Sequence, residues 1–590
     1  MEECGGLPLV LEVIGNYLWD QKEVCVWSEA LERLQKPDSL DRSADENVVW
    51  KKLKVSFERL GKLEKQLFLD VATFDLYPTC KTHYDVEIFR SAWETEGNRD
   101  IGIAIKNLEQ RSFLSVEVRF PDYIVHVHRP GDTLKGFSIH KQMRAMAAWI
   151  SGPVEENLED RRSIWQLPNV IELLTNCDKV SRPRTEVLSI SVERKTYAVA
   201  GHQLEKIKSL QWRSLGSLKV LRLLRISDMH MLGVDKLKFP AKLALLHMEN
   251  CTRERQKGNR WFPWSRLSSW PLCDENIEEL GALSVLIFEN CSFVQLPQNF
   301  HMLRCLKILR IHNSGKSMGA LPENIGLLST LKHLSLNVPL KRLPNSLLEL
   351  RSLQSLVLSG IHLQAWPVPI TIDPCCHLRA LTELHLVHLP ALVELPDTFG
   401  GLASLNNLTI ECCSALQKLP EGFGALLELR TLFIKDCSKF EQICESFFNL
   451  SKLGELDLDR LPKLRTLPAT IGDLSSLEEM YVRSCPAIKE LPGSFANLPS
   501  IRHFSIDHCH ALESLWPDNK YDSVNQGLKK LQSFSVYSCS RLQCLPKSLE
   551  LKSLRYSVKN CREFKLDTDQ LRHRPESLFS VDFTNTSVYG

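Results

Sequence analysis

The 590-residue sequence contains no run of 18 apolar residues and no large excess of charge of either sign. A membrane-spanning helix needs about 20 predominantly apolar residues, so we expect no membrane span. The formal net charge of +2 offers no general attraction to nucleic acid or acidic membranes, and we expect neither as a partner. The first residues lack the basic and apolar segments of a secretory signal peptide. We therefore expect a cytoplasmic protein with reduced cysteines.

The sequence also lacks recognisable catalytic motifs. No GxxxxGK[ST] loop, which binds nucleotide phosphates in many ATPases, occurs anywhere in the chain. Two short segments hold metal-ligand residue types, Asp507–His510 and Cys375–His377, but neither has a second pair of ligands at a spacing that completes four. No nucleophile–base arrangement or carboxylate pair stands out. We predict no catalysis, no metal and no cofactor.

A 24-residue repeat dominates the second half of the chain, with copies that begin at 395, 419, 443, 467, 491 and 515. Apolar residues keep their positions within each copy, as in Leu405-x-x-Leu408-x-Ile410. A fixed period of about 20–29 residues that carries this pattern is the signature of a leucine-rich repeat. The chain is therefore predicted to contain a leucine-rich-repeat solenoid.

The repeat pattern predicts how successive copies pack. Alternating apolar residues form a short strand with one buried face, and such strands must stack to bury it, which produces a curved parallel sheet. The position that follows each strand holds a cysteine in most copies, or Leu461 in one of them. We expect these cysteines to be buried thiols that donate to neighbouring backbone, and they are Cys413, Cys437, Cys485 and Cys509.

Upstream of the regular repeats the apolar spacing is mostly helical. It predicts helices within 7–18, 27–34, 48–72, 85–94 and 101–110, then strands at 112–118, 123–127 and 137–139, and a helix through Met146. Helices followed by a small hairpin suggest a winged-helix module. The first repeat strands are expected at 187–190 and 218–223, and 252–274 is expected to be an insertion.

The predicted fold class is α/β, with an N-terminal α-helical and winged-helix segment followed by a leucine-rich-repeat solenoid with a parallel concave sheet. The expected domains are a helical segment at 1–40, a winged-helix domain at 41–150, a linker with a first irregular repeat at 151–215, and the repeats at 216–590.

Three motifs resemble those of plant nucleotide-binding leucine-rich-repeat disease-resistance proteins that carry an N-terminal TIR domain. They are Gly6-Leu7-Pro8-Leu9, Lys65–Ala72 and Ile139-His140-Lys141. The resemblance implies that Pro8 and His140 are inherited contacts to ADP or ATP. Lys141 replaces the acidic residue of the family motif. Because the chain has no phosphate-binding loop, there is an alternative interpretation. In it, Pro8 starts a helix and His140 is a structural histidine whose hydrogen bonds are satisfied.

The resemblance implies a role in plant innate immunity, in which the repeats recognise a protein ligand or pathogen effector and contact a nucleotide-binding domain of the same protein. The chain is interpreted as an N-terminally truncated receptor, or as one that has lost the nucleotide switch. Two alternatives stay open: a nucleotide-driven switch ATPase whose nucleotide-binding half is missing, and a leucine-rich-repeat scaffold without an immune role.

The concave face provides the candidate partner-binding residues, which are His385, Phe433, Lys435, Asp457, Tyr481 and Arg483. Phe433 and Tyr481 are expected to be exposed aromatic anchors, because hot spots of interfaces favour aromatic residues. Lys435 is expected between Glu411 and Asp459 of adjacent coils, in a solvent-exposed ladder of alternating charge. The charges of that ladder either pair with one another and have a structural role, or they are part of the binding surface.

Overall fold

The computed structural model describes residues 8–19, 23–35, 53–75, 86–94, 100–119, 134–151, 162–164, 167–176, 184–191, 212–228, 230–231, 238–253, 272, 277–291, 296–312, 320–368, 378–516, 527–546, 555–564 and 579–582. It divides into two compact units, one made of 1–294 with 302–309 and the other of 295–301 with 310–590. No helix within the described ranges is long and apolar enough to cross a membrane.

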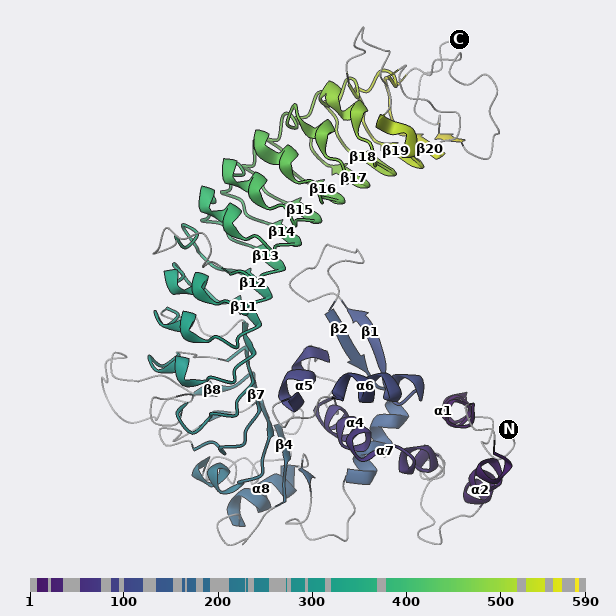
Figure 1. The fold of residues 1–590 in the computed structure, drawn as a ribbon, viewed down its shortest axis with the longest axis vertical. Coiled ribbons are helices and arrows are strands. Elements are labelled where there is room, and N and C mark those ends of the chain that lie inside the picture. The colour runs from purple at the N-terminus through teal and green to yellow at the C-terminus, as the bar shows by residue number, and fades with distance from the viewer. Residues whose placement is uncertain are drawn as a thin grey trace. The chain divides into compact units, whose positions relative to one another are not determined.

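The first unit contains the longer helices and a two-stranded antiparallel sheet (Figure 1). The helices are α1 Pro8–Leu18, α2 Val24–Gln35, α4 Lys62–Asp75, α5 Val86–Trp93, α6 Ile101–Gln110, α7 Lys141–Ser151 and α8 Leu167–Asn176. Strand β1 (Ser115–Arg119) pairs with β2 (Leu134–Ser138). The helices lie close to their predicted positions, whereas the strand predicted at 123–127 lies outside the described residues.

The same unit contains the first parallel strands of the repeats. They are β3 Ser163–Ile164, β4 Val187–Ser191, β5 Leu223–Ser227, β7 Leu245–Glu249 and β9 Val285–Glu289, with the short pair β6 His230–Met231 and β8 Thr252–Arg253 beside them. One hydrophobic core joins aromatic residues of the helices, such as Phe68 and Phe89, to strand residues such as Val187 and Val285. The helices and the first coils therefore fold as one body. Only Thr252–Arg253 and Leu272 of the expected insertion are described.

The strand predicted at 218–223 is wrong, because β5 begins at Leu223, the last residue of the predicted range. Leu221 and Leu224 are both fully buried. Leu221 corresponds to Leu405 of the regular coils, and Leu224 corresponds to Leu408, which lies in the strand. Leu218, Leu221 and Leu224 are each three residues apart. The spacing therefore does not show which of them precedes the strand and which lies in it.

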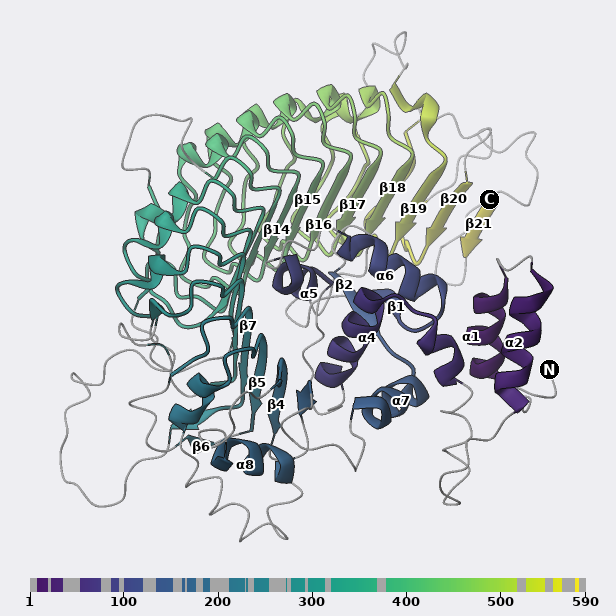
Figure 2. The ribbon, with the colours of Figure 1, turned by 60° about the horizontal axis from the view of Figure 1, so that its bottom comes forward.

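The second unit is a leucine-rich-repeat solenoid with strands that pair in parallel in chain order (Figure 2). The strands are β11 His333–Asn337, β12 Ser355–Ser359, β13 Glu383–Val387, β14 Asn407–Glu411, β15 Thr431–Lys435, β16 Glu455–Asp459, β17 Glu479–Arg483, β18 His503–Asp507, β19 Ser533–Tyr537, β20 Arg555–Lys559 and β21 Phe579–Asp582. Strand β10 (Ile308–His312) includes residues of both units. The predicted parallel sheet and its register are confirmed.

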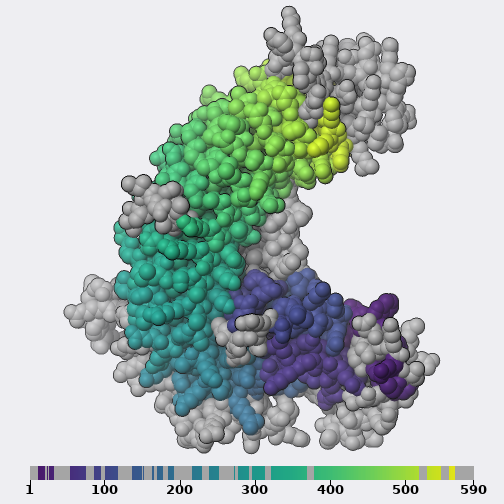
Figure 3. All heavy atoms as spheres, in the orientation of Figure 1, coloured from purple at the N-terminus to yellow at the C-terminus, as the bar shows by residue number. Residues whose placement is uncertain are grey.

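Short 3-10 helices form the side of the second unit opposite the strands (Figure 2). They include Asp397–Gly401, Glu421–Ala425 and Glu445–Asn449. Each of these helices contributes one buried phenylalanine, and Phe399, Phe423 and Phe447 stack with ring centroids 6.2 and 6.3 Å apart. Successive coils are closely packed on the face shown in Figure 3.

The residue that directly follows each strand connects one coil to the next. Cys412, Asp436 and Arg460 have φ angles of 52° to 54°. Their backbone N–H groups donate to carbonyls of the following coil at 2.9–3.0 Å. The next residue occupies the predicted cysteine position, and Cys413, Cys437, Cys485 and Cys509 are all fully buried. Cys413 Sγ lies 3.5 Å from both the Leu386 and the Glu411 carbonyl oxygens, and its single S–H can donate to either, which confirms the predicted role of the thiol as a buried backbone donor.

We predict that Gly400→Ala destabilises the solenoid and Gly401→Ala does not. A Cβ at Gly400 would lie 2.0 Å from the Gly422 carbonyl oxygen, whereas a Cβ at Gly401 would meet nothing within 4 Å. The first change should lower the free energy of unfolding by about 1–3 kcal/mol and the second by less than about 0.5 kcal/mol. Urea unfolding followed by circular dichroism measures both. Equal losses would show that the coils are packed less closely than described.

Candidate functional site

Five of the residues that face away from the core lie side by side on consecutive strands. The sheet register pairs His385 with Thr409, Thr409 with Phe433, Phe433 with Asp457, and Asp457 with Tyr481. Each occupies the middle of its strand, between two buried leucine-type residues. The structure therefore brings together His385, Phe433, Asp457 and Tyr481 in one row, as the repeat predicts.

Asp457 is the centre of a charge cluster in this row. Its Oδ2 lies 3.0 Å from Lys435 Nζ and also forms an ion pair with Arg483. Asp457 is fully buried, and Lys435 is 2% exposed. Breaking a buried pair is costly because the remaining charge is then left without compensation. The cluster therefore ties β15, β16 and β17 together through one carboxylate.

The expectation that Phe433 is exposed is wrong. The ring is 1% exposed. Thr409 and Asp457 flank it on the adjacent strands, and the Lys435 ammonium lies 5.2 Å from the ring centroid. Alternation along the strand identifies the side of the sheet on which a residue lies, but not what packs against that side. Phe433 therefore supports the surface in this structure and is not an accessible anchor.

The expectation that Lys435 belongs to a solvent-exposed ladder is also wrong. Lys435 does lie in register between Glu411 and Asp459, but its ion pair goes diagonally to Asp457. Glu411 is 2% exposed as well. Burial raises the pKa of the Asp459 carboxyl, and the charge of Asp457 adds to this rise, while Arg460 and Arg483 oppose it. The charged residues of this part of the sheet are therefore affected mainly by their burial, and not by screening from solvent.

Two accessible residues lie on β17, which are Tyr481 in the row and Arg483 two residues after it. Tyr481 is half-buried, and its hydroxyl donates to Glu479 Oε2 at 2.8 Å. The Arg483 guanidinium lies 5.6 Å from the Tyr481 ring centroid, and its side chain is 31% exposed. A held aromatic ring beside an oriented cation has the properties of an interface anchor.

His385 is a buried residue of the same face. It is 6% exposed, and burial lowers the pKa of its imidazole to about 4. Its side chain is therefore neutral at physiological pH. A neutral imidazole can donate from one ring nitrogen and accept at the other.

Pro8 and His140, the residues that resemble nucleotide contacts, both lie at helix starts. Pro8 is the first residue of α1. His140 is exposed and directly precedes α7, where its Nδ1 lies 3.2 Å from the Gln142 backbone N–H, which donates to it. Lys141 is also exposed. The helix start predicted for Pro8 is confirmed, and His140 satisfies an N–H group of the first turn of α7.

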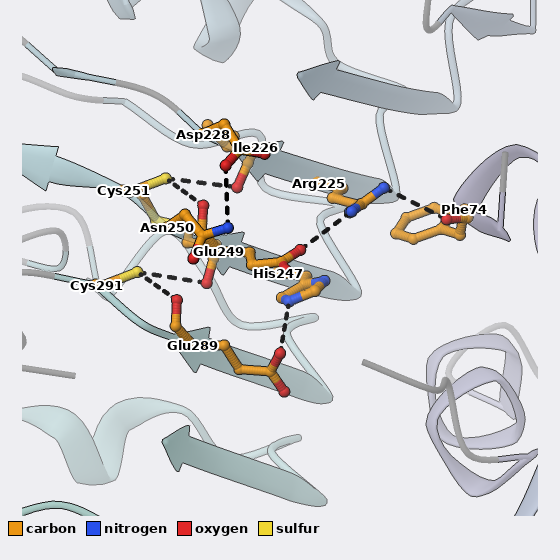
Figure 4. A network of polar contacts seen from close by, with 11 residues as sticks. Phe74, Arg225, Ile226, Asp228, His247, Glu249, Asn250, Cys251, Glu289 and Cys291 are labelled. Atoms are coloured by element: carbon orange, nitrogen blue, oxygen red, sulfur yellow. Dashed lines mark hydrogen bonds and ion pairs between the residues drawn. The ribbon is translucent and has the colours of Figure 1, made fainter. Parts of the chain in front are cut away.

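The sequence patterns did not indicate a second group of buried charges, in the first unit (Figure 4). Arg225 Nη2 lies 3.1 Å from Glu249 Oε2, and Arg225 Nη1 donates to the Phe74 carbonyl of α4 at 3.4 Å. His247 Nε2 lies 3.7 Å from Glu289 Oε2. These strand residues occupy the positions that face away from the repeat core, so helix α4 covers this part of the first coils.

Asp70, another residue of α4, also connects this helix to the first coils, through an ion pair. The Arg162 guanidinium binds both carboxylate oxygens of the fully buried Asp70, at 2.7 and 3.2 Å. Burial raises the pKa of Asp70 to about 6, although the charge of Arg162 opposes the rise. The Arg222 guanidinium lies 4.8 Å from the centroid of the Trp93 ring. Helices α4 and α5 therefore dock on the first coils through buried charges as well as apolar contacts.

One group of possible metal ligands occurs within the described ranges. Atoms of Glu411, Cys412 and Asp436 lie within 4.8 Å of one another. Asp436 is engaged by Arg460 through two ion-pair contacts. Burial raises the pKa of the Cys412 thiol to about 11, and Glu411 adds to the rise, so the thiol is protonated and a poor ligand. Of the motifs noted in the sequence, Cys375–His377 lies outside the described residues.

The regular coils, the parallel sheet and the buried cysteine positions define a leucine-rich-repeat protein. Residues 393–540 match the family model described as plant disease resistance protein RPS2-like, leucine-rich repeats. The chain is 23% identical over 373 residues to disease resistance protein At4g27190 of Arabidopsis thaliana, covering 62% of this chain and 33% of that protein. It is 24% identical over 427 residues to disease resistance protein ADR1 of Arabidopsis thaliana, covering 70% of this chain and 43% of that protein.

The chain thus spans between about a third and about two fifths of the length of these two relatives. Among solved structures, the leucine-rich-repeat protein LIC12759 of Leptospira interrogans matches 72% of this chain and 100% of that chain, with 22% identity and a TM-score of 0.44. The family model and the two Arabidopsis relatives show that the leucine-rich repeats of this chain are similar to those of plant disease-resistance proteins.

We predict that Lys435→Glu strongly destabilises the protein. The change removes a buried cation from Asp457 and places a third carboxylate beside Glu411 and Asp459, so the loss should be about 3–5 kcal/mol. Lys452→Glu is the matched control, because Lys452 pairs with Glu428 at 2.6 Å on the surface, with 48% of its side chain exposed. The control should lose at most about 1 kcal/mol. Similar small losses in the two variants, measured by urea unfolding, would contradict the burial of Lys435.

We also predict that His385 makes stability depend on pH. Its folded pKa of about 4 lies below the ordinary value of 6.5, so only the unfolded chain takes up a proton between these values. The stabilising contribution is complete above pH 6.5 and decreases as the pH falls towards 4, by about 2 kcal/mol at pH 5. Urea unfolding from pH 7 to pH 5 should show a smaller slope for His385→Asn than for the wild type. The exposed His510 provides the control His510→Asn, and an unchanged slope in His385→Asn would refute the assignment.

Proposed function

We propose that this protein recognises a protein partner, such as a pathogen effector, through the face of β13–β18 that lies opposite the repeat core, and that recognition is coupled to defence signalling in plants. The observation that carries the proposal is the Tyr481–Arg483 pair, held beside a buried charge cluster on that face. The similarity of residues 393–540 to repeats of plant disease-resistance proteins supports the biological setting.

The buried residues of the row have a supporting role in this proposal. Phe433, Lys435 and Asp457 fix the sheet surface, so that Tyr481 and Arg483 are presented in a defined geometry. A preorganised surface loses less conformational entropy when it binds a partner. His385 adds an uncharged hydrogen-bonding group at the other end of the row.

The remaining parts of the chain fit the same proposal. The α4–α7 helices with the β1–β2 hairpin are proposed to be a winged-helix module within 41–150, following a helical segment at 1–40 and preceding a linker at 151–215. The contacts of Asp70 and Arg225 would transmit changes between this module and the first coils. Buried thiols at the strand ends are consistent with a reducing compartment, and we propose a cytoplasmic location.

Expression of the full chain in leaves, with ion leakage as the readout of defence signalling, tests the function. Tyr481→Ala should weaken partner binding by about 2 kcal/mol, about 30-fold, because an aromatic anchor is lost. Phe448→Ala is the matched control, because Phe448 is an exposed aromatic residue (40%) of the outer 3-10 helix. The first variant should accumulate normally and signal poorly, and the control should signal like the wild type. Normal signalling by Tyr481→Ala would contradict the proposal.

A further inference from the structure

Two exposed histidines lie side by side where the chain leaves strand β18. Asp507 is the last residue of the strand, and His508 and His510 follow it on the two sides of the fully buried Cys509. The side chain of His508 is 55% exposed, and His510 is exposed as well. The centroids of the two imidazole rings lie 6.0 Å apart, and the ring planes are inclined by 80°. Both imidazoles are therefore accessible at one point of the surface.

The separation of the rings is close to that of two imidazoles bound to one metal ion. Metal–nitrogen bonds to histidine are about 2.0–2.1 Å long, so two imidazoles that share a tetrahedral ion have ring centroids about 5 Å apart. The rings of His508 and His510 are about 1 Å further apart than this. Exposed side chains rotate freely on a nanosecond timescale, and a small rotation of either ring closes the difference.

The carboxylate of Asp507 determines which nitrogen of His508 is available. Asp507 Oδ1 lies 2.6 Å from His508 Nδ1. A neutral imidazole carries its proton on one nitrogen and a lone pair on the other, so a proton on Nδ1, facing the carboxylate, leaves the lone pair on Nε2. Histidines that bind metals have the same arrangement, in which a carboxylate at the other ring nitrogen fixes the tautomer and the ring orientation. Asp507 thus prepares His508 as a ligand.

The repeat itself does not require this combination of residues. His388 occupies the corresponding position after β13, with a φ angle of 51° against 53° for His508, and it is also exposed. Val387 and Pro390 stand there in place of the carboxylate and the second imidazole. The β13 coil therefore contains the same backbone and a single histidine without either of its neighbours.

We propose that His508 and His510 bind a divalent first-row transition-metal ion through one nitrogen each, with Asp507 as a positioning residue and water at the remaining coordination positions. Imidazole ligands suit Zn²⁺, Cu²⁺ and Ni²⁺. The sequence predicts no metal because a second pair of ligands is missing, which applies to a closed four-ligand site. The burial of Cys509 removes its thiol from this site, so the ligands are nitrogen and oxygen, a set that favours Ni²⁺ and Cu²⁺. The proposal is independent of the proposed function.

Modification of histidines by diethyl pyrocarbonate, mapped by mass spectrometry with and without Ni²⁺, tests the proposal in the full chain. A nitrogen that is bound to metal does not react. Modification of His508 and His510 should therefore slow together, by about tenfold when free Ni²⁺ is about ten times its Kd. His388 is the internal control in the same sample, and its rate should not change. Unchanged rates at His508, or equal slowing at His388, would overturn the proposal.

The variant His510→Asn tests whether the two histidines share one ion. Loss of a residue that only orients a ligand weakens metal binding by about 10- to 100-fold, so loss of a ligand should raise the Ni²⁺ concentration that half-protects His508 at least about tenfold. The matched control is His388→Asn, which should leave that concentration within about twofold of the wild-type value. Undiminished protection of His508 in His510→Asn would show that His508 does not depend on its neighbour, and would contradict the shared site.

Discussion

The in-register stacking of coils is the constraint on which the rest of this structure depends. Each strand pairs with the next at the same position, so a residue type at one place in the repeat becomes a continuous row across the unit. Leucines form the core rows, Phe399, Phe423 and Phe447 form an aromatic row, and glycines such as Gly400 allow close approach on the outer side. Strand spacing of about 4.8 Å leaves no room for a row of incompatible side chains.

The same constraint explains why the face opposite the core is both charged and buried in part. Side chains at this spacing contact their neighbours on both adjacent strands, so Lys435 and Arg483 reach one carboxylate, Asp457. That arrangement uses both cations of β13–β18. In the first unit, helix α4 covers the corresponding positions, and Arg225 donates to the carbonyl of Phe74. Equivalent positions of the repeat thus serve an internal contact in one unit and offer a charged surface in the other.

Features that depend on local periodicity could be predicted from the sequence. The burial of Cys413, the register of Lys435 between Glu411 and Asp459, and the bounds of α6 follow from spacing alone. Features that depend on long-range packing could not. The burial of Phe433 is set by residues of neighbouring coils, and the pair between Asp70 and Arg162 joins residues 92 positions apart. The strand β5 was expected at 218–223 and begins at Leu223 for a different reason. The LxxL spacing occurs more than once within each coil, so the spacing alone does not identify the strand.

The central claim is that the row on β13–β17 combines buried supporting residues, such as Phe433 and Asp457, with an accessible Tyr481 beside Arg483. Hydroxyl-radical footprinting of the full chain, mapped by mass spectrometry, tests it directly because only aromatic rings that solvent reaches are oxidised rapidly. The account predicts oxidation of the half-buried Tyr481 and protection of Phe433, whose ring is 1% exposed. Oxidation of Phe433 at a rate similar to that of the exposed Phe448 would contradict it.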